Sequence, residues 1–87
     1  MIRLTTFKAE WCKPCHTLET QLALVAGAYP QVEFVNVDVD TQPEIAAKYR
    51  VMSVPTVLIE CDEDLRAVVV GAHPARRYLD ELKAIQA

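Results

Sequence analysis

Residues 7–16 read Phe7-Lys8-Ala9-Glu10-Trp11-Cys12-Lys13-Pro14-Cys15-His16, and the rest of the chain can be interpreted as a scaffold for this stretch. The stretch follows a short apolar run and opens a segment with helical spacing. Side chains three residues apart in a first helical turn lie on one face, with Cβ atoms about 5–6 Å apart. A disulfide needs Cβ atoms about 3.5–4.5 Å apart, so a modest local adjustment closes it. The spacing therefore predicts that Cys12 and Cys15 can form and break a disulfide at a strand-to-helix junction.

The position of the two cysteines at a helix start also favours the reactive, deprotonated form of Cys12. A helix N-terminus presents unpaired N–H groups and the positive end of the helix dipole, which stabilise a thiolate on Cys12. Pro14 suits an early helical position, where its missing N–H costs little, and it stiffens the loop between the two sulfurs. Lys13 adds a positive charge. We therefore expect Cys12 to be the reactive thiol, tuned by Lys13 and Pro14.

The composition is that of an ordinary globular domain. The 87 residues are 52% hydrophobic and 24% charged, and they predict one domain spanning residues 1–87. A net charge of −3 gives no reason to expect a nucleic-acid partner, and no apolar run is long enough to span a bilayer. The first residues lack the apolar core of a secretory signal, and an odd cysteine count argues against a secreted disulfide framework. We therefore expect a cytoplasmic location, where paired cysteines are more often catalytic or metal-binding than structural.

Seven segments with the periodicity of strands or helices follow one another along the chain. Apolar and β-branched runs predict four strands, and apolar residues recurring every three to four positions predict three helices. The expected strands are residues 2–7, 32–39, 54–59 and 65–70, and the expected helices are residues 16–26, 43–49 and 74–86. Gly27 is the expected stop of the first helix, and the charged residues 62–64 predict the turn between the last two strands.

The element order β-α-β-α-β-β-α predicts an α/β fold. A strand–helix–strand unit calls for a parallel pair with a right-handed crossover, and the last two strands are typical of a hairpin on the same sheet. We therefore expect a four-stranded mixed sheet flanked by three helices that cover both of its faces. Functional groups collect at the carboxyl ends of strands in such sheets, which is where Cys12 lies.

Several parts of the sequence resemble the thioredoxin family. Trp11-Cys12-Lys13-Pro14-Cys15, with residues 7–10 before it, looks like the active-site signature of that family. Ser53-Val54-Pro55-Thr56 resembles its cis-proline segment, Gly71-Ala72 its glycine before the last helix, and residues 38–49 the matching family stretch. The similarity covers essentially the whole chain, but the extra N-terminal strand and helix of ordinary thioredoxins are missing. The resemblance therefore implies a thioredoxin-like fold in a minimal, glutaredoxin-sized version, with a cis bond before Pro55.

The same resemblance implies a protein-disulfide reductase that needs no cofactor. Cys12 would attack an exposed disulfide of a partner protein, and Cys15 would then attack the mixed disulfide and release the reduced substrate. A thioredoxin-reductase-type flavoprotein would re-reduce the oxidised form, and we expect the protein to act as a monomer. The residues implied to line the substrate groove are Trp11, Val54, Pro55, Gly71 and Ala72.

Two positions depart from the family pattern. The family typically carries a buried Asp six residues before the first cysteine and often a Lys on the second core strand, where this chain has Thr6 and Asn36. Replacing both partners of a buried charged pair is coherent, because removing only one would leave a buried charge uncompensated. The resemblance therefore assigns Thr6 a tuning role and leaves the proton acceptor for Cys15 open.

Metal and haem binding are weaker interpretations of the same cysteines. A structural zinc site needs two more ligands, and the distant candidates Cys61 and His73 lie near opposite ends of the predicted hairpin. Cys12 to His16 also matches a c-type haem attachment pattern, with Met52 as a conceivable axial ligand. That chemistry calls for a helical, usually exported protein, whereas this chain is rich in predicted strands.

Two alternatives remain within the same fold. A glutaredoxin-like protein would use glutathione, but its glutathione site usually has a Gly-Gly pair followed by an acid, where this chain reads Gly71-Ala72-His73-Pro74. A non-catalytic thioredoxin-like binding module often loses one cysteine, whereas this chain keeps both. Dithiol–disulfide exchange is therefore the main functional hypothesis.

Overall fold

Strand β1 (Ile2–Lys8) is one of the two inner strands of the sheet in the computed structural model, which describes residues 1–86. β2 (Glu33–Asp38) pairs with β1 in parallel, and β3 (Thr56–Cys61) pairs with the other side of β1 in the antiparallel sense. β4 (Asp64–Val70) pairs antiparallel to β3, so the strand order is β2-β1-β3-β4. The predicted four-stranded mixed sheet is confirmed.

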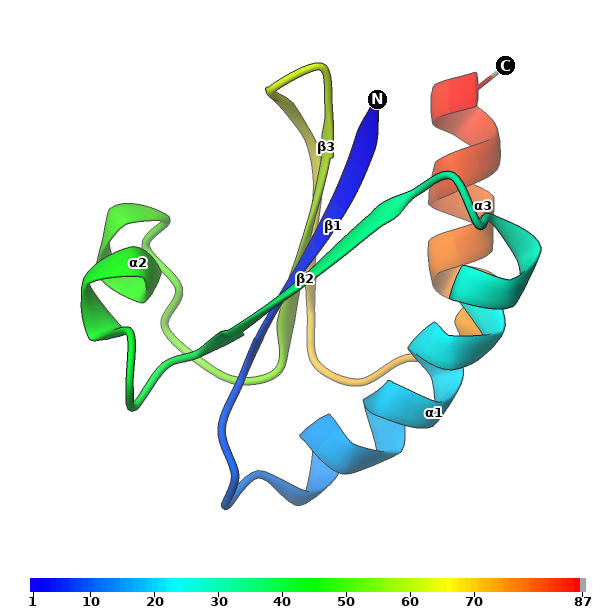
Figure 1. Ribbon diagram of the computed structural model, residues 1–87. Coiled ribbons are helices and arrows are strands. Elements are labelled where there is room, and N and C mark those ends of the chain that lie inside the picture. The colour runs from blue at the N-terminus through cyan, green and yellow to red at the C-terminus, as the bar shows by residue number, and fades with distance from the viewer. Residues whose placement is uncertain (87) are drawn as a thin grey trace.

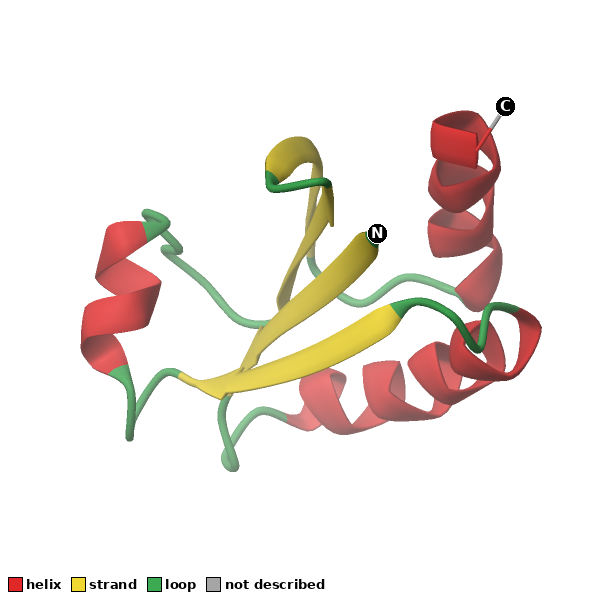
Figure 2. Cartoon of the chain, turned by 45° about the horizontal axis from the view of Figure 1, so that its top comes forward, coloured by secondary structure: helices red, strands yellow, loops and turns green. Residues whose placement is uncertain are grey.

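Three helices connect and flank these strands (Figure 1). α1 (Lys13–Ala28) joins β1 to β2, α2 (Pro43–Lys48) joins β2 to β3, and α3 (Ala75–Gln86) follows β4. Figure 2 shows α2 on one side of the strands and α1 and α3 on the other, as expected for a sheet covered on both faces. Within residues 1–86, no helix has the length and apolar character that crossing a membrane requires.

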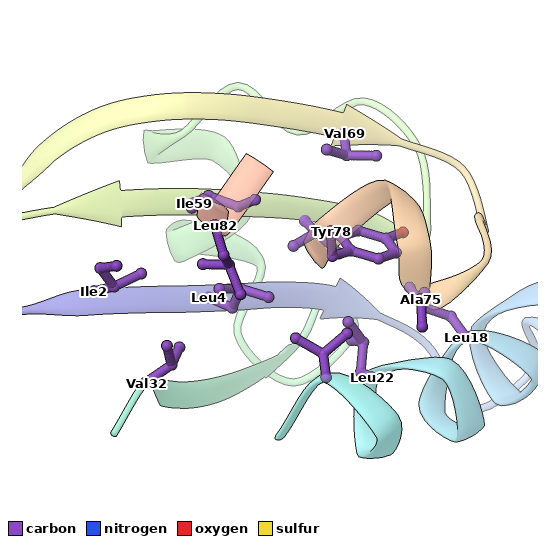
Figure 3. Packing of buried hydrophobic residues seen from close by; sticks show 12 residues of the cluster. Ile2, Leu4, Leu18, Leu22, Val32, Ile59, Val69, Ala75, Tyr78 and Leu82 are labelled. Atoms are coloured by element: carbon purple, nitrogen blue, oxygen red, sulfur yellow. The ribbon is translucent and has the colours of Figure 1, made fainter. Parts of the chain in front are cut away.

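Alternation along β1 directs its side chains into two separate cores. Leu4 is fully buried in a cluster that also contains Leu18 of α1 and Leu82 of α3, and Figure 3 shows Leu82 close to it. Phe7, three residues further on, points to the opposite face and packs with Ala46 of α2. Each fully buried side chain of this size contributes about 1.5–3 kcal/mol. Burial on both faces therefore fixes the position of β1, and with it the point where the chain leaves the sheet.

The ends of several elements differ from the sequence expectation. α1 begins at Lys13 rather than at residue 16, because Cys12 already serves as its N-cap. It continues past Gly27 to Ala28, and the N–H of Tyr29 caps it by donating to the Val25 carbonyl at 2.9 Å. The expectation that Gly27 stops the helix is therefore wrong by one residue.

β3 begins at Thr56, two residues later than expected. The Thr56 hydroxyl donates to the Ser53 carbonyl at 2.8 Å, which closes a local turn immediately before the strand. Pro55, inside that turn, has no N–H to donate to a sheet ladder. The proline therefore precedes the strand instead of opening it.

The face on the α2 side is only partly covered, since α2 has six residues. A register shift near Ile59 and Glu60 brings Leu65 onto the same face as Val68 and Val70. All three side chains are at least half exposed. The edge strand β4 thus presents an apolar strip to solvent on this side.

Tyr78 is the residue of the larger core with a buried hydroxyl. Its ring lies over the sheet with the oxygen directed toward the start of α3 (Figure 3), and the side chain is fully buried. Burial raises the pKa of this phenol, and the nearby backbone of His73 acts in the opposite direction. Among the described residues, no side chain or backbone group makes a hydrogen bond of good geometry to this oxygen. The hydroxyl is therefore the least satisfied polar group of the core.

We expect Tyr78→Phe to raise the free energy of unfolding by about 1 kcal/mol. The substitution keeps the ring and removes a buried polar atom whose desolvation is not compensated, a penalty of about 1–3 kcal/mol. Urea unfolding followed by circular dichroism measures the change, with Tyr29→Phe, at the rim of the same core, as the control. A loss of stability in Tyr78→Phe would show that the hydroxyl has a partner.

Candidate active site

Three chain segments meet at one end of the sheet because of the strand directions. β1 ends there and leads into the cysteine loop. β3 runs antiparallel to β1, so its first residues and Pro55 lie at this end. β4 runs antiparallel to β3, so its last residues and Gly71 lie there as well. The topology therefore gathers the sequence segments predicted to form the site, although they are separated along the chain.

Cys12 and Cys15 are bonded to each other at the start of α1, with their Cα atoms 5.3 Å apart. Cys12 is the N-cap of the helix, and its sulfur accepts a hydrogen bond from the backbone N–H of Cys15 at 3.2 Å. This N–H is one of the groups that a helix start leaves without an internal partner. Exposure is 4% for Cys12 and 2% for Cys15, so both are nearly buried in the bonded form. The predicted pair is thus present, and the helix start is directed at Cys12.

Several interactions hold the loop before the cysteines. The backbone N–H of Cys12 donates to the Ala9 carbonyl at 3.2 Å, and Nε2 of His16 lies 3.0 Å from the Glu10 carbonyl. Lys8, at the end of β1, forms an ion pair with Glu19 of α1 at 3.0 Å. This lysine lowers the pKa of the Glu19 carboxyl through its hydrogen bond and its charge. The loop is therefore fixed to the strand before it and to the helix after it.

Trp11 stands at the surface beside the pair and is 69% exposed. Its indole N–H donates to a carboxylate oxygen of Asp40 at 2.8 Å, which fixes the ring on the side of the β2–α2 loop. A hollow of about 160 Å³ lies next to the ring, with Met52 and Val54 among its lining residues. Met52 is 94% exposed. An exposed aromatic ring beside a hollow of apolar side chains is suited to contact a partner chain.

The other predicted groove residues lie where the topology expects them. Val54 packs against the cluster formed by Ala9 and the two cysteines, and the peptide bond from Val54 to Pro55 is cis, as the sequence implied. The backbone N–H of Gly71 donates to the Pro55 carbonyl at 2.8 Å. Ala72 follows Gly71 and is exposed. Pro55 thus links the side that carries the cysteines to the Gly71–Ala72 side.

The residues predicted to tune the pair have different surroundings. Lys13 and Pro14 are exposed in the first turn of α1. Thr6 is buried, at 4% exposure, and it pairs in register with Asn36 on β2. Asn36 is exposed, since β2 is an edge strand, so the interpretation of these two positions as a replaced buried pair is wrong for Asn36. Only Thr6 occupies the interior behind the site.

Sequence reasoning missed three residues of this region. The sequence places Asp40 only in a stretch that resembles the family and does not indicate that its carboxylate reaches Trp11. The haem pattern offers Met52 as an axial ligand, whereas its place three residues before Pro55 is the signal for a groove position. The sequence offers His73 as a zinc ligand, but its imidazole lies 2.9 Å from the Val70 carbonyl. Within residues 1–86, no three His, Cys, Asp or Glu side chains gather as a metal site would require.

The family model for thioredoxin matches residues 2–84 of the chain. The chain belongs to the thioredoxin family. A thioredoxin from Staphylococcus epidermidis is 37% identical over 82 residues, which cover 93% of this chain and 79% of that protein. Thioredoxin-2 of Pyricularia oryzae is 38% identical over 73 residues, or 84% of this chain and 43% of the relative. The crystal structure of thioredoxin from Trypanosoma brucei brucei has a TM-score of 0.90 at 33% identity, covering 98% of this chain and 74% of that chain.

Family membership confirms the resemblance on which the site prediction was built. The fold also agrees, because the thioredoxin from Trypanosoma brucei brucei superimposes on nearly the whole chain. The chain spans 43% of the length of the relative from Pyricularia oryzae, so it corresponds to less than half of that thioredoxin. The thioredoxin-like features of the site are the cysteine pair, Trp11 and the Pro55 segment.

Proposed function

We propose that the protein is a thiol–disulfide oxidoreductase that reduces disulfides of partner proteins through Cys12 and Cys15. The observation that carries the proposal is the bonded pair at the start of α1, where the sulfur of Cys12 accepts the N–H of Cys15. The same N–H and the helix dipole stabilise negative charge on Cys12 after reduction. Cys12 is therefore the nucleophile, and Cys15 is the resolving thiol.

The reaction consists of two exchanges. The Cys12 thiolate attacks one sulfur of the substrate disulfide, so that a mixed disulfide forms and the other substrate sulfur leaves as a thiolate. Cys15 then loses its proton and attacks the Cys12 sulfur, which restores the Cys12–Cys15 bond and releases the second substrate thiolate. Two electrons pass from the dithiol to the substrate, and the departing thiolates take up two protons, from Cys15 and from water.

The groove beside the cysteines is suited to an extended polypeptide. Trp11, Val54, Pro55, Gly71 and Ala72 form its walls in this proposal, and the backbone at Val54 would pair with the substrate chain in a short β-like contact. A thioredoxin-reductase-type flavoprotein supplies the electrons. That the protein acts as a monomer in the cytoplasm, without membrane or nucleic acid, stays a prediction from the sequence.

Exchange of cysteine for serine tests the two roles. Cys12→Ser should lower insulin reduction by dithiothreitol to the uncatalysed rate, because the attacking sulfur is gone. Cys15→Ser should instead accumulate a stable mixed disulfide, detectable by mass spectrometry, because nothing resolves it. Cys61→Ser is the matched control and should keep full activity, since Cys61 lies at the far end of β3 from Pro55. Faster alkylation of Cys15 than of Cys12 in the reduced protein would contradict the assignment.

The electron donor separates the main proposal from the glutaredoxin alternative. The turn after β4 contains Gly71-Ala72-His73-Pro74 and has neither the second glycine nor the acid expected of a glutathione site. We therefore expect NADPH consumption to be at least tenfold faster with a thioredoxin reductase than with glutathione and glutathione reductase, at equal insulin concentration. Faster turnover with glutathione would support the alternative, and no turnover with either donor or with dithiothreitol would indicate a binding module.

We further propose that no buried acid titrates together with the two thiols, because the neutral Thr6 stands where the family typically has an Asp. In this proposal Lys13 supplies positive charge near Cys12, and Pro14 stiffens the loop between the two cysteines.

In a background with Cys15→Ser and Cys61→Ser, where Cys12 is the remaining thiol, the ultraviolet absorbance of the thiolate should then rise in one simple step as pH increases. Thr6→Asp places a buried carboxyl behind Cys12, where desolvation raises the pKa of that carboxyl and couples it to the thiol, so a second step should appear. Thr6→Ala is the control and should titrate like the parent. A two-step curve in the parent would contradict the proposal.

A further inference from the structure

The turn between β4 and α3 carries one wall of the proposed groove. Gly71 has a φ of 88°, a backbone conformation that glycine adopts without steric cost. Its N–H donates to the Pro55 carbonyl at 2.8 Å. The position of Gly71 and Ala72 relative to Pro55 therefore depends on how this turn is held.

The last carbonyl of β4 has no partner in the sheet. Antiparallel ladders alternate between residue pairs that exchange hydrogen bonds and pairs that do not. Because Gly71 donates a hydrogen bond to Pro55, the next pair, Thr56 with Val70, is one that exchanges no hydrogen bonds. The backbone groups of Val70 consequently point away from β3, toward the free edge of the sheet, since β4 is an edge strand.

His73 supplies the missing partner. Its Nε2 lies 2.9 Å from the Val70 carbonyl oxygen. A carbonyl only accepts, so Nε2 carries the proton and the neutral ring is the Nε2–H tautomer. The imidazole folds back over the turn, because Nε2 lies 3.8 Å from the place where a Cβ at Gly71 would be. The side chain thus closes a ring from Val70 to His73 around the glycine.

The start of α3 is fixed from another side. The backbone N–H of Ala75, at the start of α3, donates to the side-chain oxygen of Gln21 on α1 at 2.9 Å. Between the bond from Gly71 to Pro55 and the bond from Ala75 to Gln21, the imidazole of His73 attaches the turn to the last carbonyl of β4.

We infer that His73 is a positioning residue of the disulfide-exchange site. By donating to the Val70 carbonyl, it holds Ala72 in place next to Gly71, whose own N–H is bonded to Pro55, so that this wall of the groove keeps the position that an extended substrate chain requires. His73 touches no reacting sulfur in this role, and its loss affects the binding of a polypeptide more than the exchange reaction itself. The inference rests on the proposed function.

The decisive variants are His73→Phe, which keeps an aromatic ring and removes the donor, and His73→Gln, which returns an N–H at a similar distance from the backbone. Each reduced protein is mixed with insulin or with cystamine, a small disulfide that does not occupy an extended groove. Acid quenching, alkylation and mass spectrometry follow the formation of the Cys12–Cys15 bond. Arg76→Gln, at an exposed position on the first turn of α3, is the control.

We expect His73→Phe to react with insulin about fivefold more slowly, the effect of losing roughly one hydrogen bond, and with cystamine at the parent rate. His73→Gln should recover most of the insulin rate, and Arg76→Gln should change neither rate. Equal losses with both disulfides, or an unchanged insulin rate in His73→Phe, would overturn the positioning role. A parent protein that reduces neither disulfide would instead refute the proposed function.

A measurement on the unaltered protein keeps the inference testable if His73→Phe does not fold. Nitrogen-15 chemical shifts of the imidazole distinguish the two neutral tautomers. The His73 ring should be in the Nε2–H form. A ring in the Nδ1–H form would overturn the inference without any assay of activity.

Discussion

The burial of β1 on both faces is the constraint on which the site depends. Leu4 is enclosed by α1 and α3, and Phe7 by the α2 side, so the strand can neither rotate nor shift by one residue without exposing one of them. The chain leaves this fixed strand at Lys8 and enters α1 at Lys13. With only four residues between the two elements, Cys12 has to lie at the helix start. The place of the first cysteine at the helix start is therefore a consequence of how a hydrophobic strand is packed.

Much of the fold could be predicted because its signals are local and periodic. The helical spacing of Cys15, Leu18, Leu22 and Val25 identified the buried face of α1, and all four side chains are buried. The β-α-β order implied the parallel pair β1–β2, and the charged turn implied the hairpin of β3 and β4. The cysteine pair and the Pro55 segment could be recognised as well, because each is a short motif of unusual residues. Strand directions then bring the two motifs to the same end of the sheet.

The parts that could not be predicted depend on contacts between distant elements. The sequence places Asn36 on a strand, but only the strand order shows that this strand is at the edge and that the side chain is exposed. The bond between Trp11 and Asp40 joins two loops, and a carboxylate near an indole has no signature in a single sequence. The bond from His73 to Val70 depends on which carbonyls the β3–β4 register leaves free. For Asn36 and His73 the decisive fact is the order or register of strands, and for Trp11 it is the approach of two loops; short motifs encode neither.

The interior behind the cysteines is neutral, and this determines how the pair can be reactive. Within residues 1–86 the buried polar side chains other than the cysteines and Tyr78 are threonines, at positions 5, 6 and 56. A thiolate there would have no buried cation to compensate it, and burial of an isolated charge is costly. The charge must therefore be stabilised on the Cys12 side, where the N–H of Cys15 and the helix start are directed. On Cys15 the same charge would lack this N–H donor, so the direction of the backbone dipoles favours the proposed assignment of Cys12 as the nucleophile.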